Sequence, residues 1–520
     1  MPLPYNTTAL TKDQTPDVLA SDMPSSNKDK RLVHRSLATE IIFVGVVCAA
    51  QLLTQAGLAL SIAPQTLIAQ SFHITDPGTA SWFSAAYSLT VGTFILPAGR
   101  VGDVFGHKRF LAGGFAWFGV WSALAGCAAY SGPILFAFCR AMQGMGPAFM
   151  LPNAVAILGR AYEAGSMRQN MVYSLFGATA PSGFIVGAVF SSLLAQKTWW
   201  PWAYWVMALA CLLFAVLSVF AVPATVRESA QEDGNDLFCQ RVDLFGSVAG
   251  VSALILFNFA WNQGPVVGWT QPYTYSIMIV GILAFVLFIF IEKRATHPLI
   301  PFGVLKIDSL FTLACIGAGW SSFGIFVLYT WNFVVQFRHQ TPLLSSAQFS
   351  PVAISGLCAA VGTGIALSNL RPSSVILVSM VGFAAGGAIL ATMPIHQTYW
   401  AQEFVGLIVL PWGMDMSFPA ATIVLSRAMP RKHQGLAASL VNTFVNYSIS
   451  IGLGFAGTVD SNVNDGGREV LRGFRGALYL GVGLAGLGVV VALLFCFVEW
   501  YRSDTCEKME QESENKLDSA

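Results

Sequence analysis

The stretch Gly99-Arg-Val-Gly-Asp103-Val-Phe-Gly106-His-Lys108-Arg109 joins two long apolar segments, residues 80–98 and 110–130. It is charged and rich in glycine, and glycine permits a tight turn at a membrane surface. Each flanking segment has about the 20 largely apolar residues that a helix needs to cross a bilayer. The stretch therefore predicts two membrane-spanning helices joined by a short polar turn, which its basic residues would hold in the cytoplasm.

The composition of the whole chain is typical of a membrane protein. Of its 520 residues, 55% are hydrophobic and 11% are charged, whereas a soluble domain has roughly 25% charged residues. The formal net charge of +1 gives no electrostatic basis for binding nucleic acid. The nine cysteines form neither a CxxC pair nor a cluster with histidine, so we expect no metal site, no disulfide framework and no cofactor.

Fourteen segments are long and apolar enough to cross a bilayer. Their approximate bounds are 38–63, 80–98, 110–130, 132–159, 168–194, 201–222, 243–263, 271–292, 309–334, 346–368, 373–392, 400–426, 433–459 and 474–499. The sequence thus predicts an all-α polytopic membrane protein with 14 transmembrane helices.

The basic residues predict the orientation of these helices. With the N-terminus inside, 22 of the 28 Lys and Arg residues fall in cytoplasmic regions, five fall outside, and Arg140 lies within a span. Both termini are therefore expected in the cytoplasm. The terminal regions, residues 1–37 and 501–520, contain no apolar run, so we predict disordered cytoplasmic tails and no cleaved signal peptide.

The polar stretch at 99–109 resembles a loop motif of the major facilitator superfamily of membrane transporters. The matching residues are Gly99, Asp103, Gly106, Lys108 and Arg109. The resemblance implies that Asp103 binds an arginine of a neighbouring helix and a helix N-terminus, and so stabilises the outward-open state. Arg160 stands at the position of that arginine, and the eleventh or thirteenth span would supply the N-terminus. The alternative is a plain solvated turn, since Val104 and His107 replace usual basic residues.

The same resemblance implies two six-helix halves joined by a cytoplasmic linker. Fourteen spans fit this plan as six, two and six. The predicted regions are the tail 1–37, the N-terminal half 38–222, the linker 223–242, two extra helices 243–292, the C-terminal half 293–500 and the tail 501–520. Arg160-Ala161 and Arg427-Ala428 end corresponding spans as a weak repeat, whereas the turn around Arg371 lacks the acid and glycines of the loop motif.

Arg140 and Gln143, within the fourth span, resemble a second motif of the family. An arginine inside a span normally faces a cavity or a partner, and Gln143 lies on the same helix face one turn later. The resemblance links this arginine to proton movement in drug/proton antiporters. The alternative is a structural arginine tied to backbone carbonyl groups.

Glycine and proline residues in the fifth predicted span resemble the antiporter motif of the family. Proline bends a helix, and a GxxxG pair lets another helix approach closely. The residues are Gly177, Pro181, Gly183 and Gly187. Because the usual Gly-Pro-x-x-Gly-Gly spacing is not reproduced, helix packing unrelated to antiport is the alternative.

Two polar residues are candidates for the transport pathway. Asp415 is the acidic residue placed deepest in a predicted span, and a buried carboxyl group that gains and loses a proton can couple proton flow to substrate movement. The alternative is a structural partner for an arginine or a helix terminus. Gln55 is expected to line the cavity, because the first helix does so in relatives of the family. The pairs Asn258/Asn262 and Asn442/Asn446 are expected to form hydrogen bonds between helices.

One departure refines the resemblance. Many fourteen-helix antiporters carry an aspartate in the first span, and the corresponding region here, residues 51–58, has none. Together with Pro201-Trp202, His433-Gln434-Gly435 and Asn442-Thr-Phe-Val-Asn446, this resembles the fungal aminotriazole- and boron-resistance branch of the drug/proton antiporters. Some relatives of that branch are reported as low-affinity ammonium transporters.

The expected function is therefore secondary active transport of a small molecule. The leading hypothesis is proton-coupled efflux of toxic compounds, drugs or secondary metabolites by a monomer in the plasma membrane, with the vacuolar membrane as the alternative. The second hypothesis is a low-affinity facilitator or importer of a small polar solute such as ammonium or boric acid. A receptor or an enzyme is disfavoured, because the sequence shows no nucleophile–base or metal constellation and no large tail.

Overall fold

The computed structural model describes residues 37–162, 166–223, 243–295, 298–300, 305–428 and 434–518. Within these residues the regular elements are helices. The N-terminal helices are α1 (Leu37–Ile62), α2 (Gln65–Ser71), α3 (Pro77–Phe105), α4 (His107–Cys127), the 3-10 turn η2 (Ala128–Tyr130), α5 (Pro133–Ala161), α6 (Met167–Lys197) and α7 (Pro201–Ala221). They are followed by α9 (Leu244–Val267), α10 (Pro272–Glu292), α11 (Ile307–Phe337), α12 (Pro342–Phe349), α13 (Pro351–Asn369), α14 (Pro372–Ala391), α15 (Gln402–Ala428), α16 (Gln434–Val463) and α17 (Val470–Asp518).

The described helices confirm the fourteen-span prediction. Thirteen are long and apolar enough to cross a membrane by length and composition, with α12 and α13 counted together. The fourteenth is α3, whose 29 residues are more polar and which packs against α5 and α16 inside the bundle. The fold is therefore an all-α membrane bundle with the predicted number of spans.

Two helix boundaries differ from the prediction. The span expected at 346–368 is interrupted, since α12 ends at Phe349 and α13 begins at Pro351. Proline is favoured in the first turn of a helix and terminates the preceding one. The prediction of a disordered C-terminal tail is wrong, because α17 continues as a helix to Asp518. The N-terminal tail and residues 224–242 of the expected linker lie outside the described residues.

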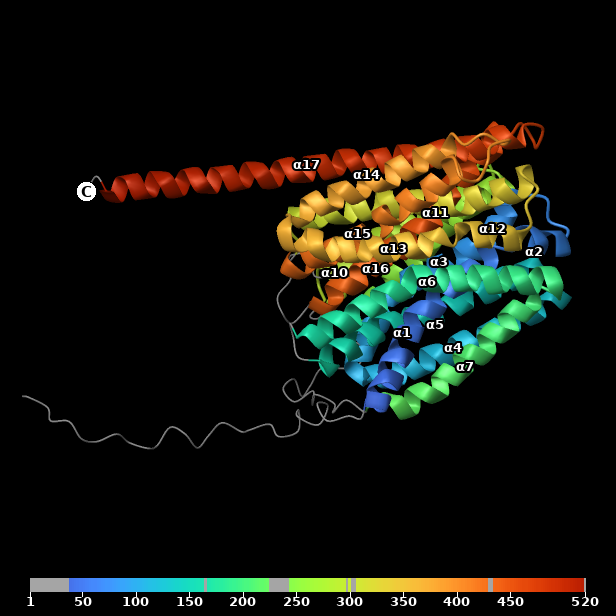
Figure 1. Ribbon diagram of the computed structural model, residues 1–520, viewed down its shortest axis with the longest axis horizontal. Coiled ribbons are helices and arrows are strands. Elements are labelled where there is room, and N and C mark those ends of the chain that lie inside the picture. Colours follow the sequence, from blue (N-terminus) through green and yellow to red (C-terminus); the bar gives the residue numbers. More distant parts are fainter. Residues whose placement is uncertain are drawn as a thin grey trace, which may run out of the picture.

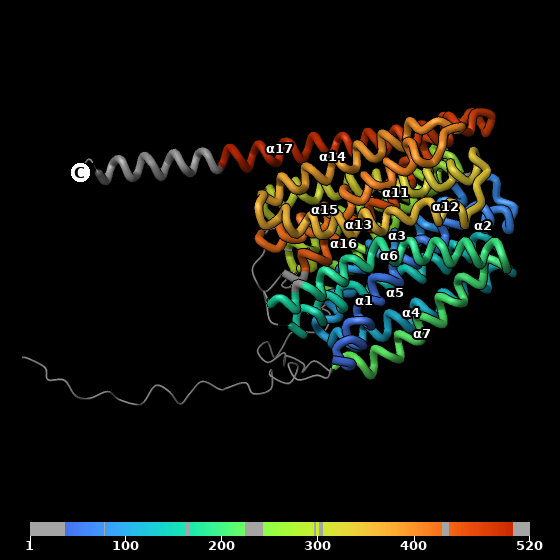
Figure 2. Tube along the Cα trace, in the orientation of Figure 1, coloured from blue at the N-terminus to red at the C-terminus, as the bar shows by residue number. Residues whose placement is uncertain are grey.

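The helices form two groups that lie side by side (Figures 1 and 2). In the N-terminal group, α1 packs on α6, while α4 packs on α5 and α7. In the C-terminal group, α14 packs on α15 and α17, and α11 packs on α16 and α17. The groups meet where α3 packs on α16 and where α6 packs on α12 and α13. The interface between the two groups is therefore formed by α3, α6, α12, α13 and α16.

The extra pair α9–α10 packs at the edge of this interface. Helix α9 contacts α3 and α16, and α10 packs on α9. Two amides attach α9, because Asn262 Nδ2 donates to the Ser450 carbonyl at 3.2 Å and Ser450 Oγ lies 2.9 Å from Asn258 Oδ1. The expected interhelical hydrogen bonding of Asn258 and Asn262 is confirmed. The pair thus joins the bundle through polar contacts in the membrane interior.

Candidate functional site

The loop motif forms a polar cluster at the predicted cytoplasmic end of the N-terminal half. Asp103 Oδ1 lies 3.8 Å from Arg160 Nη2 and 3.4 Å from His107 Nε2. His107 Nδ1 lies 2.7 Å from Asn153 Oδ1 of α5. The side chains of Asp103 and Arg160 are 56% and 42% exposed, whereas His107 is buried. The cluster therefore joins the end of α3, the start of α4 and the inner half of α5.

The stretch 99–109 is almost entirely helical, contrary to the expected polar turn. Helix α3 continues to Phe105 and α4 begins at His107, so Gly106 alone separates them. Gly106 has φ of 101°, a backbone conformation that glycine adopts without the steric cost of a Cβ atom. Gly102 has a different role, since a Cβ there would overlap the Asn153 amide. The motif is thus a one-residue corner between two helices packed closely on α5.

Helix α16 packs near its start against Gly99, the first residue of the motif. A Cβ built on Gly99 would lie 3.4 Å from Ser439 Oγ, in the second turn of α16. Of the two helix N-termini considered from the sequence, α16 is the thirteenth span and α14 the eleventh. The contact therefore places the thirteenth span beside the motif.

Arg140 is fully buried and binds neutral groups from three helices. Its Nε donates to the Phe83 carbonyl at 2.8 Å, and its Nη2 donates to the Gly57 carbonyl at 2.8 Å and to Ser61 Oγ at 3.1 Å. Its Nη1 donates to Gln143 Oε1 on its own helix. The structure shows no carboxylate paired with Arg140 in the part of the chain that it describes. This arrangement matches the structural alternative, in which carbonyl groups hold the arginine.

The same network includes an aromatic ring and a hydroxyl group. The guanidinium carbon of Arg140 lies 4.5 Å from the centroid of the Tyr87 ring, a cation–π distance. Gln143 Nε2 donates to Ser122 Oγ of α4 at 2.5 Å. Arg140 and Gln143 therefore connect α1, α3, α4 and α5 inside the N-terminal half.

The antiporter-like glycines pack α6 on α1. A Cβ on Gly183 would lie 2.8 Å from the Leu52 Cα, and one on Gly187 would lie 2.5 Å from the Ala56 Cα. Each glycine thus permits a close backbone approach, as in GxxxG packing. Gly177 differs, because nothing lies within 4 Å of a Cβ built there. The glycines explain helix contact, which was the alternative interpretation.

Pro181, from the same motif, lies beside Asp415 at the interface of the two halves. A Cβ built on Gly356 of α13 would lie 2.7 Å from Asp415 Oδ2 and 3.1 Å from Pro181 Cβ. Oδ2 of Asp415 is buried and has no hydrogen-bond partner among the described residues. Helices α6, α13 and α15 therefore converge on one carboxylate near the middle of α15. Sequence reasoning missed Gly356, because only the packing of α13 on α15 and α6 shows what it faces.

The other polar candidates lie partly exposed along the inner helices. Gln55 is half-buried in α1, where most neighbouring positions are buried. Asn442 and Asn446 donate to carbonyl groups one turn earlier in α16, at 3.1 Å and 3.0 Å. The expectation of bonds between helices is not met for this pair in the described structure. Their amides stay on α16, and the placement of Gln55 is compatible with a cavity-lining role.

Sequence reasoning also missed a second acid inside a helix. Asp460 lies just beyond the predicted span 433–459, but α16 continues to Val463 and Asp460 is 3% exposed. Tyr329 of α11 donates to Asp460 Oδ2 at 3.4 Å. The sequence could not predict where α16 ends, because the polar residues after 459 could either continue the helix or begin a loop.

On the predicted outer side, hydrogen bonds join the two halves. Asn332 Nδ2 of α11 donates to Gln65 Oε1 of α2 at 2.7 Å. The buried hydroxyl groups of Ser192 in α6 and Ser346 in α12 lie 2.8 Å apart. Ser346 Oγ also donates to the Ala188 carbonyl at 3.1 Å. These contacts close the outer side of the interface in this structure.

Known proteins match the chain over most of its length. The family model described as Major Facilitator Superfamily matches residues 46–373. A low affinity ammonium transporter of Saccharomyces cerevisiae is 60% identical over 90% of this chain and 91% of its own. The efflux pump terJ of Aspergillus terreus is 48% identical over 93% of both chains. An aminotriazole resistance protein of Saccharomyces cerevisiae is 38% identical over 88% of this chain and 84% of its own.

A solved structure supports the fold. The peptide transporter POT matches with a TM-score of 0.63 and 13% identity, covering 91% of this chain and 98% of its own. The predicted resemblance to the aminotriazole-resistance branch is confirmed by the sequence relatives. This chain belongs to the major facilitator superfamily of membrane transporters and carries a small-molecule substrate.

Proposed function

We propose that the protein exports small, amphipathic toxic compounds in exchange for protons, with Asp415 as the group that carries the proton. The observation that supports this is the place of Asp415, whose buried Oδ2 faces Gly356 and Pro181 where the halves meet. A carboxyl group inside a membrane is costly and normally serves transport or pairing. Since no basic partner of Asp415 is found in the described part of the chain, a role in proton exchange explains it better than an ion pair.

The mechanism follows from the two sets of contacts between the halves. While the outer bonds Gln65–Asn332 and Ser192–Ser346 hold, separation of the inner contacts would let substrate reach Asp415 from the cytoplasm. Opening of the outer side would break these bonds and bring the carboxyl group into contact with external water. The Asp103 cluster and the Gly99–Ser439 contact, which are both formed in this structure, would hold the inner side closed in that state. A neutral Asp415 moves between these states at lower cost than a charged one, because a charge in the apolar interior must be compensated.

The test compares Asp415→Asn with Asp415→Glu in vesicles that carry an imposed proton gradient. The Asp415→Asn variant should lose gradient-driven uptake of aminotriazole into inverted vesicles. The Asp415→Glu variant should keep part of this uptake. Asp465→Asn is the matched control, because Asp465 lies 59% exposed in the turn before α17. Gradient-driven transport that persists unchanged in Asp415→Asn would contradict the proposal.

A second candidate is low-affinity passage of ammonium. It is favoured by the 60% identical relative, whose name states that activity, and by the absence of an acid in α1 at residues 51–58. Uptake of labelled methylammonium by vesicles separates the two candidates. If methylammonium uptake is unchanged when the proton gradient is collapsed, and if ammonium inhibits it, facilitated passage is favoured over proton exchange.

We place the protein in the plasma membrane as a monomer. Export of a toxic compound protects a cell only if the compound crosses the plasma membrane or enters a storage compartment, so the vacuolar membrane is the alternative. The site around Asp415 is formed within one chain, since the contacts that surround this residue come from α6, α13 and α15 of the same protein. A fluorescent fusion and its elution volume after extraction test the membrane and the oligomeric state.

A further inference from the structure

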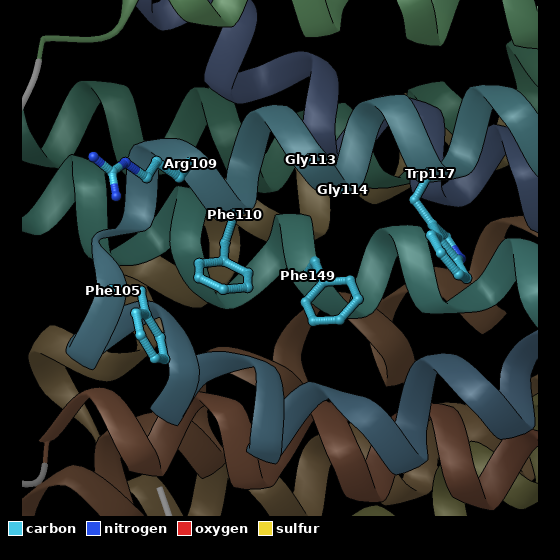
Figure 3. A pocket seen from close by; sticks show the side chains of 7 residues that line it. All are labelled: Phe105, Arg109, Phe110, Gly113, Gly114, Trp117 and Phe149. Atoms are coloured by element: carbon cyan, nitrogen blue, oxygen red, sulfur yellow. The ribbon is translucent and has the colours of Figure 1, made fainter. Parts of the chain in front are cut away.

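A groove on the surface of the N-terminal half is separate from the interface around Asp415. It has a volume of about 410 Å³ and lies between α3, α4 and α5 (Figure 3). The residues that line it are Phe105, Arg109, Phe110, Gly113, Gly114, Trp117 and Phe149. In Figure 3 the aromatic side chains follow one another along the groove, and Arg109 lies at one end. The lining is thus apolar along its length and positively charged at one end.

The groove faces the lipid. Gly113 and Trp117 lie on the same face of α4 as Val120 and Leu124, which are 50% and 43% exposed, because residues three, four and seven apart share a helix face. Apolar side chains exposed on a spanning helix are in contact with acyl chains. Gly113 leaves the floor open, since nothing lies within 4 Å of a Cβ built there. The groove therefore offers space that acyl chains of the bilayer can fill.

The charged end of the groove lies at the cytoplasmic surface. Arg109 is in the first turn of α4 and is exposed, with Lys108 beside it. No acidic residue lines the groove. Asp103, the acid nearest in sequence, is already close to His107 and Arg160. Basic residues at this depth attract anionic headgroups of the inner leaflet, and basic pockets between spanning helices bind them.

We propose that this groove binds one anionic phospholipid of the cytoplasmic leaflet, with an acyl chain along Phe110, Phe149 and Trp117 and the phosphate at Arg109. The lipid would contact both sides of the corner at Gly106, because Phe105 ends α3 and Arg109 begins α4. Bound lipid thereby stabilises the arrangement of α3 and α4 that presents Asp103 to Arg160. The inner side of the transporter becomes sensitive to the headgroup composition of the membrane.

Native mass spectrometry of the full-length protein, with added phosphatidylserine or phosphatidylcholine, tests the proposal. The wild-type protein should retain one phosphatidylserine about fivefold more strongly than phosphatidylcholine, the ratio for one basic residue at an anionic surface. Gly113→Leu fills the groove and should lose both lipids. Arg109→Gln should keep an acyl chain but bind the two headgroups equally. Soluble glycerophosphoserine should not displace the lipid, because it has no acyl chain.

Two control variants separate the groove from general effects. Gly483→Leu adds the same side chain to an exposed site of α17 with nothing within 4 Å, and Arg371→Gln removes an exposed charge before α14. Both should bind lipid as the wild-type protein does. Retention of phosphatidylserine by Gly113→Leu, an unchanged headgroup ratio in Arg109→Gln, or equal loss in Gly483→Leu would each overturn the proposal. Because Arg109 is exposed, Arg109→Gln should fold, and its headgroup preference tests the proposal even if Gly113→Leu fails to fold.

Discussion

Arg160 Nη2 lies 3.8 Å from Asp103 Oδ1, and both side chains are substantially exposed to solvent. An exposed ion pair contributes about 0.2–1 kcal/mol. The pair alone is therefore too weak to hold a transporter in one state. Its neighbours add buried contacts, since His107 bridges Asp103 and Asn153. The cluster acts as a unit of one exposed ion pair and one buried hydrogen bond.

The first prediction concerns this cluster. Asp103→Asn and Arg160→Gln should each shift the balance between inward- and outward-open states by less than fivefold, whereas Asn153→Ala should shift it further because it removes the buried bond to His107. A Ser439→Cys reporter in α16, probed by a thiol reagent, measures the inner opening. Effects of Asp103→Asn and Arg160→Gln that simply add in the double variant would show that the two residues do not interact.

The second prediction concerns Arg140. Arg140→Lys keeps the charge but cannot make bonds to Phe83, Gly57 and Ser61 together, because lysine lacks the planar fork of donors. We expect destabilisation of about 3–5 kcal/mol, the range for breaking a buried charged network. Thermal unfolding of the detergent-extracted protein, followed by size-exclusion chromatography, measures it. Gln143→Glu supplies a second test, since a negative charge beside the guanidinium should raise the melting temperature.

If Arg140 instead moves protons, the outcome differs. Arg140→Lys would then remain as stable as the wild-type protein and lose transport. A stable, inactive variant thus favours the proton-linked interpretation, and an unstable one favours the structural network that the bonds to carbonyl groups indicate.

The sequence predicts the spans well because lipid imposes a strong length and hydropathy requirement on every helix. Asp415 could be selected for the same reason, since one acid stands out in an apolar segment. Its surroundings could not be predicted, because Gly356 and Pro181 reach it from helices far apart in sequence. The stretch 99–109 was mistaken for a turn, since polar residues at a helix end look like a loop until the packing of Gly102 on Asn153 is known.

The third prediction concerns Gly356. Gly356→Ala should reduce transport at least tenfold, because the new methyl group would lie 2.7 Å from Asp415 Oδ2 and displace the carboxylate. Gly364→Ala, also in α13, has nothing within 4 Å and is the matched control. Uptake rates normalised to the amount of protein in the membrane measure the effect. Equal rates for the two variants would mean that the position of the Asp415 carboxylate does not limit transport.

The fourth prediction concerns the outer contacts. Asn332→Ala and Gln65→Ala each remove the same hydrogen bond, so each should weaken outer closure by about 1 kcal/mol and the double variant by no more than the larger single effect. Ser191, which is buried and donates to the Ala188 carbonyl within α6, serves as the reporter after substitution by cysteine. Its reaction with a membrane-impermeant thiol reagent should be slow in the parent and about fivefold faster in either alanine variant, since 1 kcal/mol corresponds to that factor. Thr198→Ala is the control, because its hydroxyl bonds within α6 at Leu194. A double variant that reacts far faster than both single variants would show that Gln65 and Asn332 close the outer side through separate partners.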